Sequence, residues 1–178
     1  EDTINYIPPR VKIEISCLSM DEPTELRPIR SLIGESFDGE DTDAESLVRT
    51  VVPTRTFLEK LFLLAEEFQK EKPRSVRMSR HLYDLEKLMD TEYGKDALSN
   101  RKLYDAIVEH RKTYYALKYV NYDLHTPSTI NFTIPESAME AWQDDYADMR
   151  RFFIYGESLE FGALIQKMKE LQERVRIM

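Results

Sequence analysis

The chain has very little cysteine and no long apolar run, and each absence excludes a class of protein. Its single cysteine, Cys17, cannot form an internal disulfide, and we interpret it as a small buried hydrophobic side chain in a reducing cytoplasm. No apolar run approaches the ~20 residues of a bilayer-spanning helix, so we expect no membrane association. The first three residues, Glu-Asp-Thr, lack the basic and apolar regions of a signal peptide. They also lack an initiator Met, so we expect the chain to begin within its gene.

Basic charge is scarce relative to acidic charge. The sequence has 25 Lys and Arg against 33 Asp and Glu, a formal net charge of −8. This balance argues against broad, non-specific nucleic-acid binding, which depends on neutralising phosphates, but it leaves room for a local basic patch. Paired charges on helices usually form solvated faces, and we expect that of each basic cluster here. The clusters are Arg74/Arg77/Arg80, Arg101-Lys102, Arg111-Lys112 and Arg150-Arg151.

Several catalytic and metal-binding motifs are also missing. There is no Gly-rich phosphate loop, no G-x-S-x-G turn and no dinucleotide-binding fingerprint. The chain has 3 His and no His/Cys cluster, so we expect no structural zinc site. The 178 residues, 42% hydrophobic and 33% charged, are typical of a soluble globular protein with one real core.

The N-terminal part of the sequence predicts strands. Residues 10–18 alternate apolar and polar side chains, which is typical of a half-buried strand. Residues 47–52 are rich in β-branched side chains and predict a second strand, which ends before Pro53. Residues 24–45 mix acidic residues with Gly and Pro, and we predict a loop there with room for one short helix or strand. Its apolar anchors are Leu26, Ile29, Leu32 and Ile33.

After Pro53 the apolar spacing changes to that of helices, and we predict about five of them. Ser79 is the expected cap of the second helix and Gly94 its end; Thr54 or Thr56 would cap the first. The third helix is expected from about residue 99 to 119, the fourth after Pro135, and the fifth after Gly156. The expected inner faces are Phe57/Leu61/Leu64/Ala65/Phe68, Leu82/Leu85/Leu88/Met89, Leu103/Ile107/His110/Tyr114, Met139/Trp142/Tyr146/Met149/Phe153 and Leu164/Met168/Leu171/Val175.

These elements predict an α+β fold in which two or three strands precede a helical bundle. Two strands alone are marginally stable, so they need a partner. One hypothesis is a small domain whose sheet packs on the helices. The other divides the chain into residues 1–52, the last strands of a larger, incomplete sheet, and residues 53–178, a helical domain.

Lys60 and Asp84 are the charged residues that lie closest to the predicted core. Lys60 is at the border of the first apolar stripe, so its stem can be covered while its ammonium reaches either solvent or a cleft. Asp84 can pair with Arg80 one turn earlier, or with Lys60 if the two helices pack. His81 lies three residues before Asp84, and a lone histidine is more often a core or capping residue than a ligand.

Glu14 is the strand carboxylate of interest. An acid between β-branched residues suits a solvated strand face, and it equally suits a strand that lines a metal site. The sequence by itself favours the solvated face.

Four segments in this order resemble the AbiEii-type nucleotidyltransferase toxins. They are V-K-I-E-I-S at 11–16, V-V-P-T-R-T-F-L-E-K-L-F-L-L at 51–64, M-S-R-H-L-Y-D-L at 78–85, and W-x3-Y-x2-M at 142–149 followed by Y-G-E. The T-F-x-E-K-L and R-H-x-x-D-L pair is the most specific part.

The resemblance implies a polymerase-β-like nucleotidyltransferase with an added helical domain, acting as the toxin of a bacterial toxin–antitoxin or abortive-infection system. It places Lys60 and Asp84 in the active site, Lys60, Arg80 and His81 at the nucleotide, and Glu14 at the metal. It also implies Mg²⁺, a nucleoside triphosphate donor, an acceptor such as a tRNA 3′ end, and a cognate antitoxin protein.

One departure from the family pattern bears on activity. The family's glycine–serine motif and first metal-binding acids precede the strand at 10–18 and are absent here, so we expect this chain to be inactive alone. The alternative is a non-catalytic helical module that binds an antitoxin or other protein, in which the same charges form ion pairs. Convergence of Lys60, Asp84 and Glu14 on one cleft would favour the enzyme.

Overall fold

The computed structural model describes residue 13, residues 24–37 and residues 45–178. Apart from residue 13, the strand predicted over 10–18, with Glu14 and Cys17, lies outside these residues. The described chain is a two-stranded sheet with helices, so the predicted α+β class is confirmed. The elements are β1 (Thr24–Arg30), α1 (Leu32–Ser36), β2 (Glu45–Val51), α2 (Pro53–Glu67), α3 (Ser79–Leu88), α4 (Glu92–Ser99), α5 (Arg101–His110), the π-helix η1 (Arg111–Tyr115), the 3₁₀ turns η2 (Tyr122–Leu124) and η3 (Glu136–Ala138), α6 (Met139–Phe152) and α7 (Phe161–Arg176).

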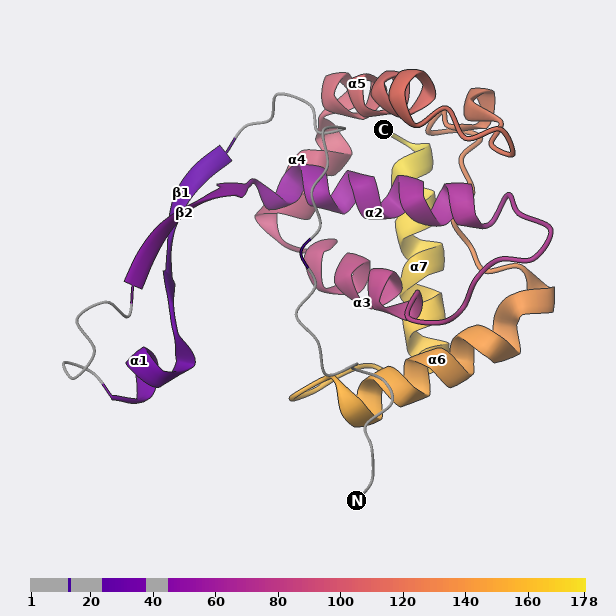
Figure 1. Cartoon of the computed structure of the whole chain (residues 1–178). Coiled ribbons are helices and arrows are strands. Elements are labelled where there is room, and N and C mark those ends of the chain that lie inside the picture. The colour runs from indigo at the N-terminus through magenta and orange to yellow at the C-terminus, as the bar shows by residue number, and fades with distance from the viewer. Residues whose placement is uncertain (1–12, 14–23, 38–44) are drawn as a thin grey trace.

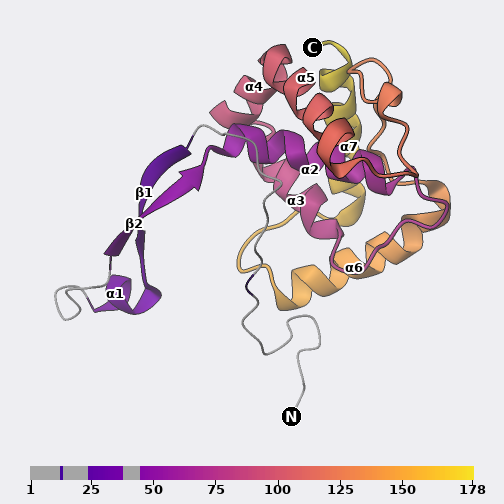
Figure 2. The ribbon, with the colours of Figure 1, turned by 45° about the horizontal axis from the view of Figure 1, so that its top comes forward.

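Strands β1 and β2 form an antiparallel hairpin that extends away from the helices (Figures 1 and 2). The strand predicted at 47–52 is confirmed as β2. The prediction for 24–45, a loop with one short helix or strand, is wrong in part because its first part forms both β1 and α1. The sequence of β1 lacks the usual strand pattern because it contains Pro28 and three charged residues. The strand forms because β2 supplies its hydrogen-bond partners. The predicted anchors are also wrong, since all four are exposed.

The hairpin makes little contact with the helical block. Most of its described side chains are exposed, including Leu47 at 65%, so this sheet does not pack on the helices as the first hypothesis required. Arg27 Nη2 donates a hydrogen bond to the Tyr93 hydroxyl of α4 at 3.3 Å. The division into residues 1–52 and 53–178 stays a prediction.

The core lies among the helices, and α2 crosses its centre (Figure 1). Buried apolar residues surround α2 on several sides, because α3, α4 and α5 all contact it. Most predicted inner faces are confirmed, including Trp142, Tyr146 and Met149 of α6 and all four residues predicted for α7. Each such side chain contributes about 1.5–3 kcal/mol through burial. None of the helices within the described ranges is long and apolar enough to cross a membrane.

The capping residues predicted for the N-termini of α2 and α3 are wrong. Val52 is the N-cap of α2, with Pro53 in the first turn, and the Thr54 hydroxyl instead donates to Asp96 Oδ2 at 3.0 Å. At α3, Asp145 of α6 accepts a hydrogen bond from the Ser79 amide at 3.0 Å and another from the Ser79 hydroxyl. A carboxylate distant in sequence therefore performs the capping that was predicted for Ser79.

Gly94 does not end the second helix. Helix α3 ends at Leu88, and Gly94 lies in α4, where an added Cβ would be 2.3 Å from the Leu88 carbonyl oxygen. Glycine here permits the close approach of two helices. The predicted third helix is also shorter and less regular: α5 continues as η1, which ends at Ala116 with a φ of 45°.

Candidate functional site

Lys60 and Asp84 meet across α2 and α3. Lys60 Nζ lies 2.6 Å from Asp84 Oδ2, and the two side chains are 22% and 36% exposed. Lys60 lies at the border of the buried α2 face between Phe57 and Leu61, both fully buried, as its position in the apolar stripe predicted. The pair is therefore held by packed helices but remains open to solvent.

His81 lies next to this pair and is buried, with 8% exposed. Burial is the main cause that lowers its pKa, and together with the nearby positive charges of Lys60 and Arg80 it brings the pKa to about 4. The ring is therefore neutral at pH 7, and its Nδ1 atom is buried without a hydrogen-bond partner. An unpaired buried nitrogen is uncommon in a folded protein and can mark a functional site.

The field around His81 is mainly positive. Lys60, Arg80 and Arg74 each lower the pKa of His81, whereas Asp84 raises it. Arg80 is exposed in the first turn of α3, and the Arg74 side chain is 66% exposed. Exposed cations beside a half-covered lysine can bind a phosphate group.

The structure brings together four of the five predicted site residues, Lys60, Asp84, Arg80 and His81, and the fifth, Glu14, lies outside the described residues. Across the described ranges, no group of three or more His, Cys, Asp or Glu side chains could hold a metal ion. Asp84 is the carboxylate that contacts Lys60 and cannot form a metal site alone. The described residues therefore do not provide the Mg²⁺ site that the resemblance implies.

Comparison with protein families decides the family. A family model described as the nucleotidyl transferase AbiEii toxin of a Type IV toxin–antitoxin system matches residues 2–168. The chain belongs to the AbiEii family. Searches of curated proteins and of solved structures found no match. The resemblance inferred from the sequence is thereby confirmed, and with it the toxin–antitoxin context of the family.

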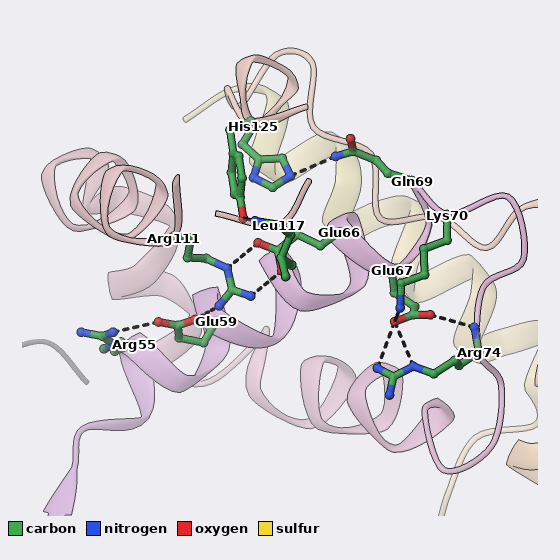
Figure 3. Close-up of polar contacts among 11 residues, drawn as sticks. Arg55, Glu59, Glu66, Glu67, Gln69, Lys70, Arg74, Arg111, Leu117 and His125 are labelled. Atoms are coloured by element: carbon green, nitrogen blue, oxygen red, sulfur yellow. Dashed lines mark hydrogen bonds and ion pairs between the residues drawn. The ribbon is translucent and has the colours of Figure 1, made fainter. Parts of the chain in front are cut away.

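A second charged cluster of this AbiEii-family chain is buried beside the site (Figure 3). Arg111 of η1 donates to both carboxylate oxygens of Glu66, at 2.7 and 2.5 Å, and also pairs with Glu59. Arg55 donates to the other oxygen of Glu59 at 2.8 Å. Burial lowers the pKa of Arg111, but the bonds and charge of Glu66 outweigh it, so the pKa is raised overall. Since Glu59 precedes Lys60, this network fixes the helical turn that carries Lys60.

Glu67 forms a third cluster at the end of α2 (Figure 3). It is 3% exposed, and its carboxylate accepts hydrogen bonds from Lys70 at 2.8 Å and from the Arg74 side chain at 3.0 and 3.2 Å. Burial raises the pKa of Glu67, but these bonds outweigh it and lower the pKa overall. Glu67 thus holds Arg74, whose positive charge lowers the pKa of His81.

The solvated face predicted at Arg111 is wrong, because Arg111 is only 5% exposed. A signal was present in the sequence. Arg111 follows Tyr104 by seven residues and Ile107 by four, so it continues the buried stripe of α5. Glu59 and Glu66 are also seven residues apart and lie on one face of α2.

Proposed function

We propose that this chain belongs to an enzyme that transfers a nucleotidyl group from a nucleoside triphosphate to an acceptor such as a tRNA 3′ end. Family membership supports the reaction class. The single observation that carries the assignment to a site is the Lys60–Asp84 pair beside neutral His81 and exposed Arg80.

Lys60 is the proposed cation for the triphosphate. In nucleotidyl transfer, the acceptor hydroxyl oxygen attacks the α-phosphorus, the bond to pyrophosphate breaks, and the hydroxyl proton leaves to a base or solvent. Negative charge accumulates on the pyrophosphate, so a positioned ammonium lowers the barrier. Asp84 holds that ammonium in place through the 2.6 Å contact and is the candidate proton acceptor.

Arg80 and His81 are proposed to contribute differently. Arg80 is exposed and can meet a phosphate directly, whereas His81 is covered and neutral, so it supports the turn that carries Arg80 and Asp84. Mg²⁺ is part of the proposal through the family, and Glu14 is its proposed ligand. When bound, the ion would neutralise phosphate charge.

The test is labelling of tRNA with radioactive triphosphates by the complete gene product and by its Lys60→Ala variant. We expect K60A to lower the rate by about 10²-fold or more, because an electrostatic contact to the reacting group is lost. Lys87→Ala is the matched control, since Lys87 is also a helical lysine paired with a neighbouring acid, Glu86, at 3.2 Å. Equal rates for K60A and K87A would remove Lys60 from the proposed mechanism.

One observation favours the alternative, a module that binds an antitoxin or other protein. The hairpin exposes several large apolar side chains, including Leu26, Ile29, Leu47 and Val48. If the gene product shows no transfer with any of the four nucleotides but binds its antitoxin, and Leu47→Asp abolishes that binding, the alternative is correct.

A further inference from the structure

The segment that follows α5 concentrates aromatic residues. Four of the chain's 10 tyrosines lie between positions 114 and 122. Tyr114, Tyr119 and Tyr115 are 62%, 45% and 38% exposed, whereas Tyr104 and Tyr146 in the core are almost fully buried. These three exposed rings are therefore not required by the core.

An unusual backbone presents these rings. Tyr114 and Tyr115 lie in the π-helix η1, a form often found at functional sites, and Ala116 ends it in the left-handed region at a φ of 45°. The Ala116 amide donates to the Arg111 carbonyl at 3.0 Å, and Arg111 is anchored on α2 as described above.

The following turn is also tied down. The Leu117 amide donates to the Tyr122 hydroxyl at 3.2 Å, and the Asn121 amide donates at 2.7 Å to Oε1 of Gln69, which lies just after α2. The exposed tyrosines thus lie on a fixed backbone, so little ordering is needed before a ligand binds.

Basic side chains lie among the rings. Lys70 Nζ is 5.1 Å from the centre of the Tyr119 ring, and the Arg111 guanidinium is 4.6 Å from the centre of the Tyr115 ring. Lys112 and Lys118 are exposed in the same segment. We call Lys70, Lys112, Tyr114, Tyr115, Lys118 and Tyr119 the η1 surface.

Acidic residues near the η1 surface offset only part of this charge, and the exposed Glu71 that follows Lys70 is balanced by the exposed Lys72. Glu67 is buried and shared between two cations, Lys70 and Arg74, which leaves one surplus positive charge. Asp123 pairs with Lys112 at the longer distance of 3.6 Å. Glu109 is exposed one turn before Thr113, whose hydroxyl donates to it at 3.3 Å.

We propose that the η1 surface binds a single-stranded polynucleotide. Unpaired bases stack on the exposed tyrosine rings, and the backbone phosphates contact Lys70, Lys112 and Lys118. Base stacking does not need a particular sequence, whereas a paired duplex hides the faces of its bases, so the surface selects single strands. The local basic patch binds despite the net charge of −8.

The η1 surface adjoins the candidate site through Arg74. Glu67 pairs with Lys70 of the η1 surface at 2.8 Å and with Arg74 at 3.0 Å, and the positive charge of Arg74 lowers the pKa of His81. A strand on the η1 surface could thus continue toward Lys60. Its identity as the acceptor rests on the proposed function, whereas binding itself does not.

The test is fluorescence anisotropy with fluorescein-labelled 12-mers of single-stranded RNA, single-stranded DNA of the same sequence and duplex RNA, without triphosphate or metal. We expect Tyr114→Ala and Tyr119→Ala each to weaken single-strand binding about ten-fold, and Tyr119→Phe to retain it because the ring remains. Tyr155→Ala is the matched control, since Tyr155 is 97% exposed on the α6–α7 loop. We expect Lys118→Ala to lower the salt dependence of binding.

Each outcome decides the proposal. Similar affinity for RNA and DNA supports it as stated, and preference for RNA supports it with RNA as the natural ligand. The proposal is overturned if duplex RNA binds as tightly as single-stranded RNA. It is also overturned if Y114A and Y119A bind single strands as tightly as the control Y155A. If these two variants instead lose only binding to the antitoxin, the surface is a protein interface and the proposal is also overturned. Melting followed by circular dichroism confirms that each variant is folded.

The proposal and the proposed function can fail separately. If K60A loses nucleotidyl transfer but binds RNA normally, this result supports both the proposed function and the binding surface. Loss of RNA binding in Y119A with unchanged transfer shows that the bound strand is not the acceptor, while the binding surface stands.

Discussion

Replacing Arg111 by methionine tests whether the buried ion-pair network stabilises the fold around Lys60. Arg111 and Glu66 have side chains that are 6% and 4% exposed and share two hydrogen bonds. Methionine fills a similar volume but leaves the Glu66 carboxylate buried without its partner. Breaking one side of a buried pair costs about 3–5 kcal/mol in the free energy of unfolding. For a chain of this size, such a loss lowers Tm by roughly 10 °C.

Thermal and urea unfolding of three variants would measure this effect. Arg101→Met is the matched control, because Arg101 pairs with Asp105 on an exposed helical turn, where such pairs contribute only about 0.3–0.5 kcal/mol. The double variant Arg111→Met/Glu66→Gln removes the unpaired charge, so we expect it to be more stable than R111M alone.

Two results together decide whether the buried pair stabilises the fold: the loss in R111M and its partial relief in the double variant. A loss below about 1 kcal/mol, or a double variant that is less stable than R111M, would refute the reasoning.

Three further predictions concern stability. The pKa of His81 is about 4 in the folded state and 6.5 in the unfolded state, so the unfolded state takes up a proton first as the pH falls. We therefore expect up to about 3 kcal/mol of the free energy of unfolding to be lost between pH 6.5 and pH 4. Urea unfolding of His81→Gln at several pH values should lack this pH-dependent loss. Asp145→Ala should cost about 1–2 kcal/mol by uncapping α3 and more than Asp144→Ala, an exposed neighbour; equal midpoints in urea would contradict this. Gly94→Ala should destabilise the fold by about 1–3 kcal/mol because the added Cβ meets backbone atoms of Leu88 and Met89. Gly162→Ala should stabilise it slightly, because no atom lies within 4 Å of the added Cβ. Calorimetry that reverses this order would disprove the packing argument.

Much of the helical block could be predicted from the sequence. The apolar faces of α2, α6 and α7 follow from spacing, because a helix repeats every 3.6 residues and burial selects one side of it. The closeness of Lys60 to the core followed in the same way, since a residue between Phe57 and Leu61 must border the buried stripe.

The helix caps, the helix ends and strand β1 could not be predicted from apolar spacing. Ser79 has the residue type of an N-cap, yet the carboxylate that accepts its amide hydrogen is Asp145, 66 residues later. Gly94 resembles a helix end, yet the close approach of α3 and α4 decides its place inside α4. Strand β1 was also missed, because a strand with Pro28 and several charges is recognised through its partner rather than through its own pattern.

The sequence by itself determined the family, the helical spacing and the candidate pair, because these depend on the order and type of neighbouring residues. Only the tertiary structure decided that Lys60 lies 2.6 Å from Asp84, that Arg111 is buried against Glu66, and that tyrosines near η1 remain exposed. The physical reason is that ion pairing and burial depend on distances between segments far apart in the chain, which no local pattern specifies.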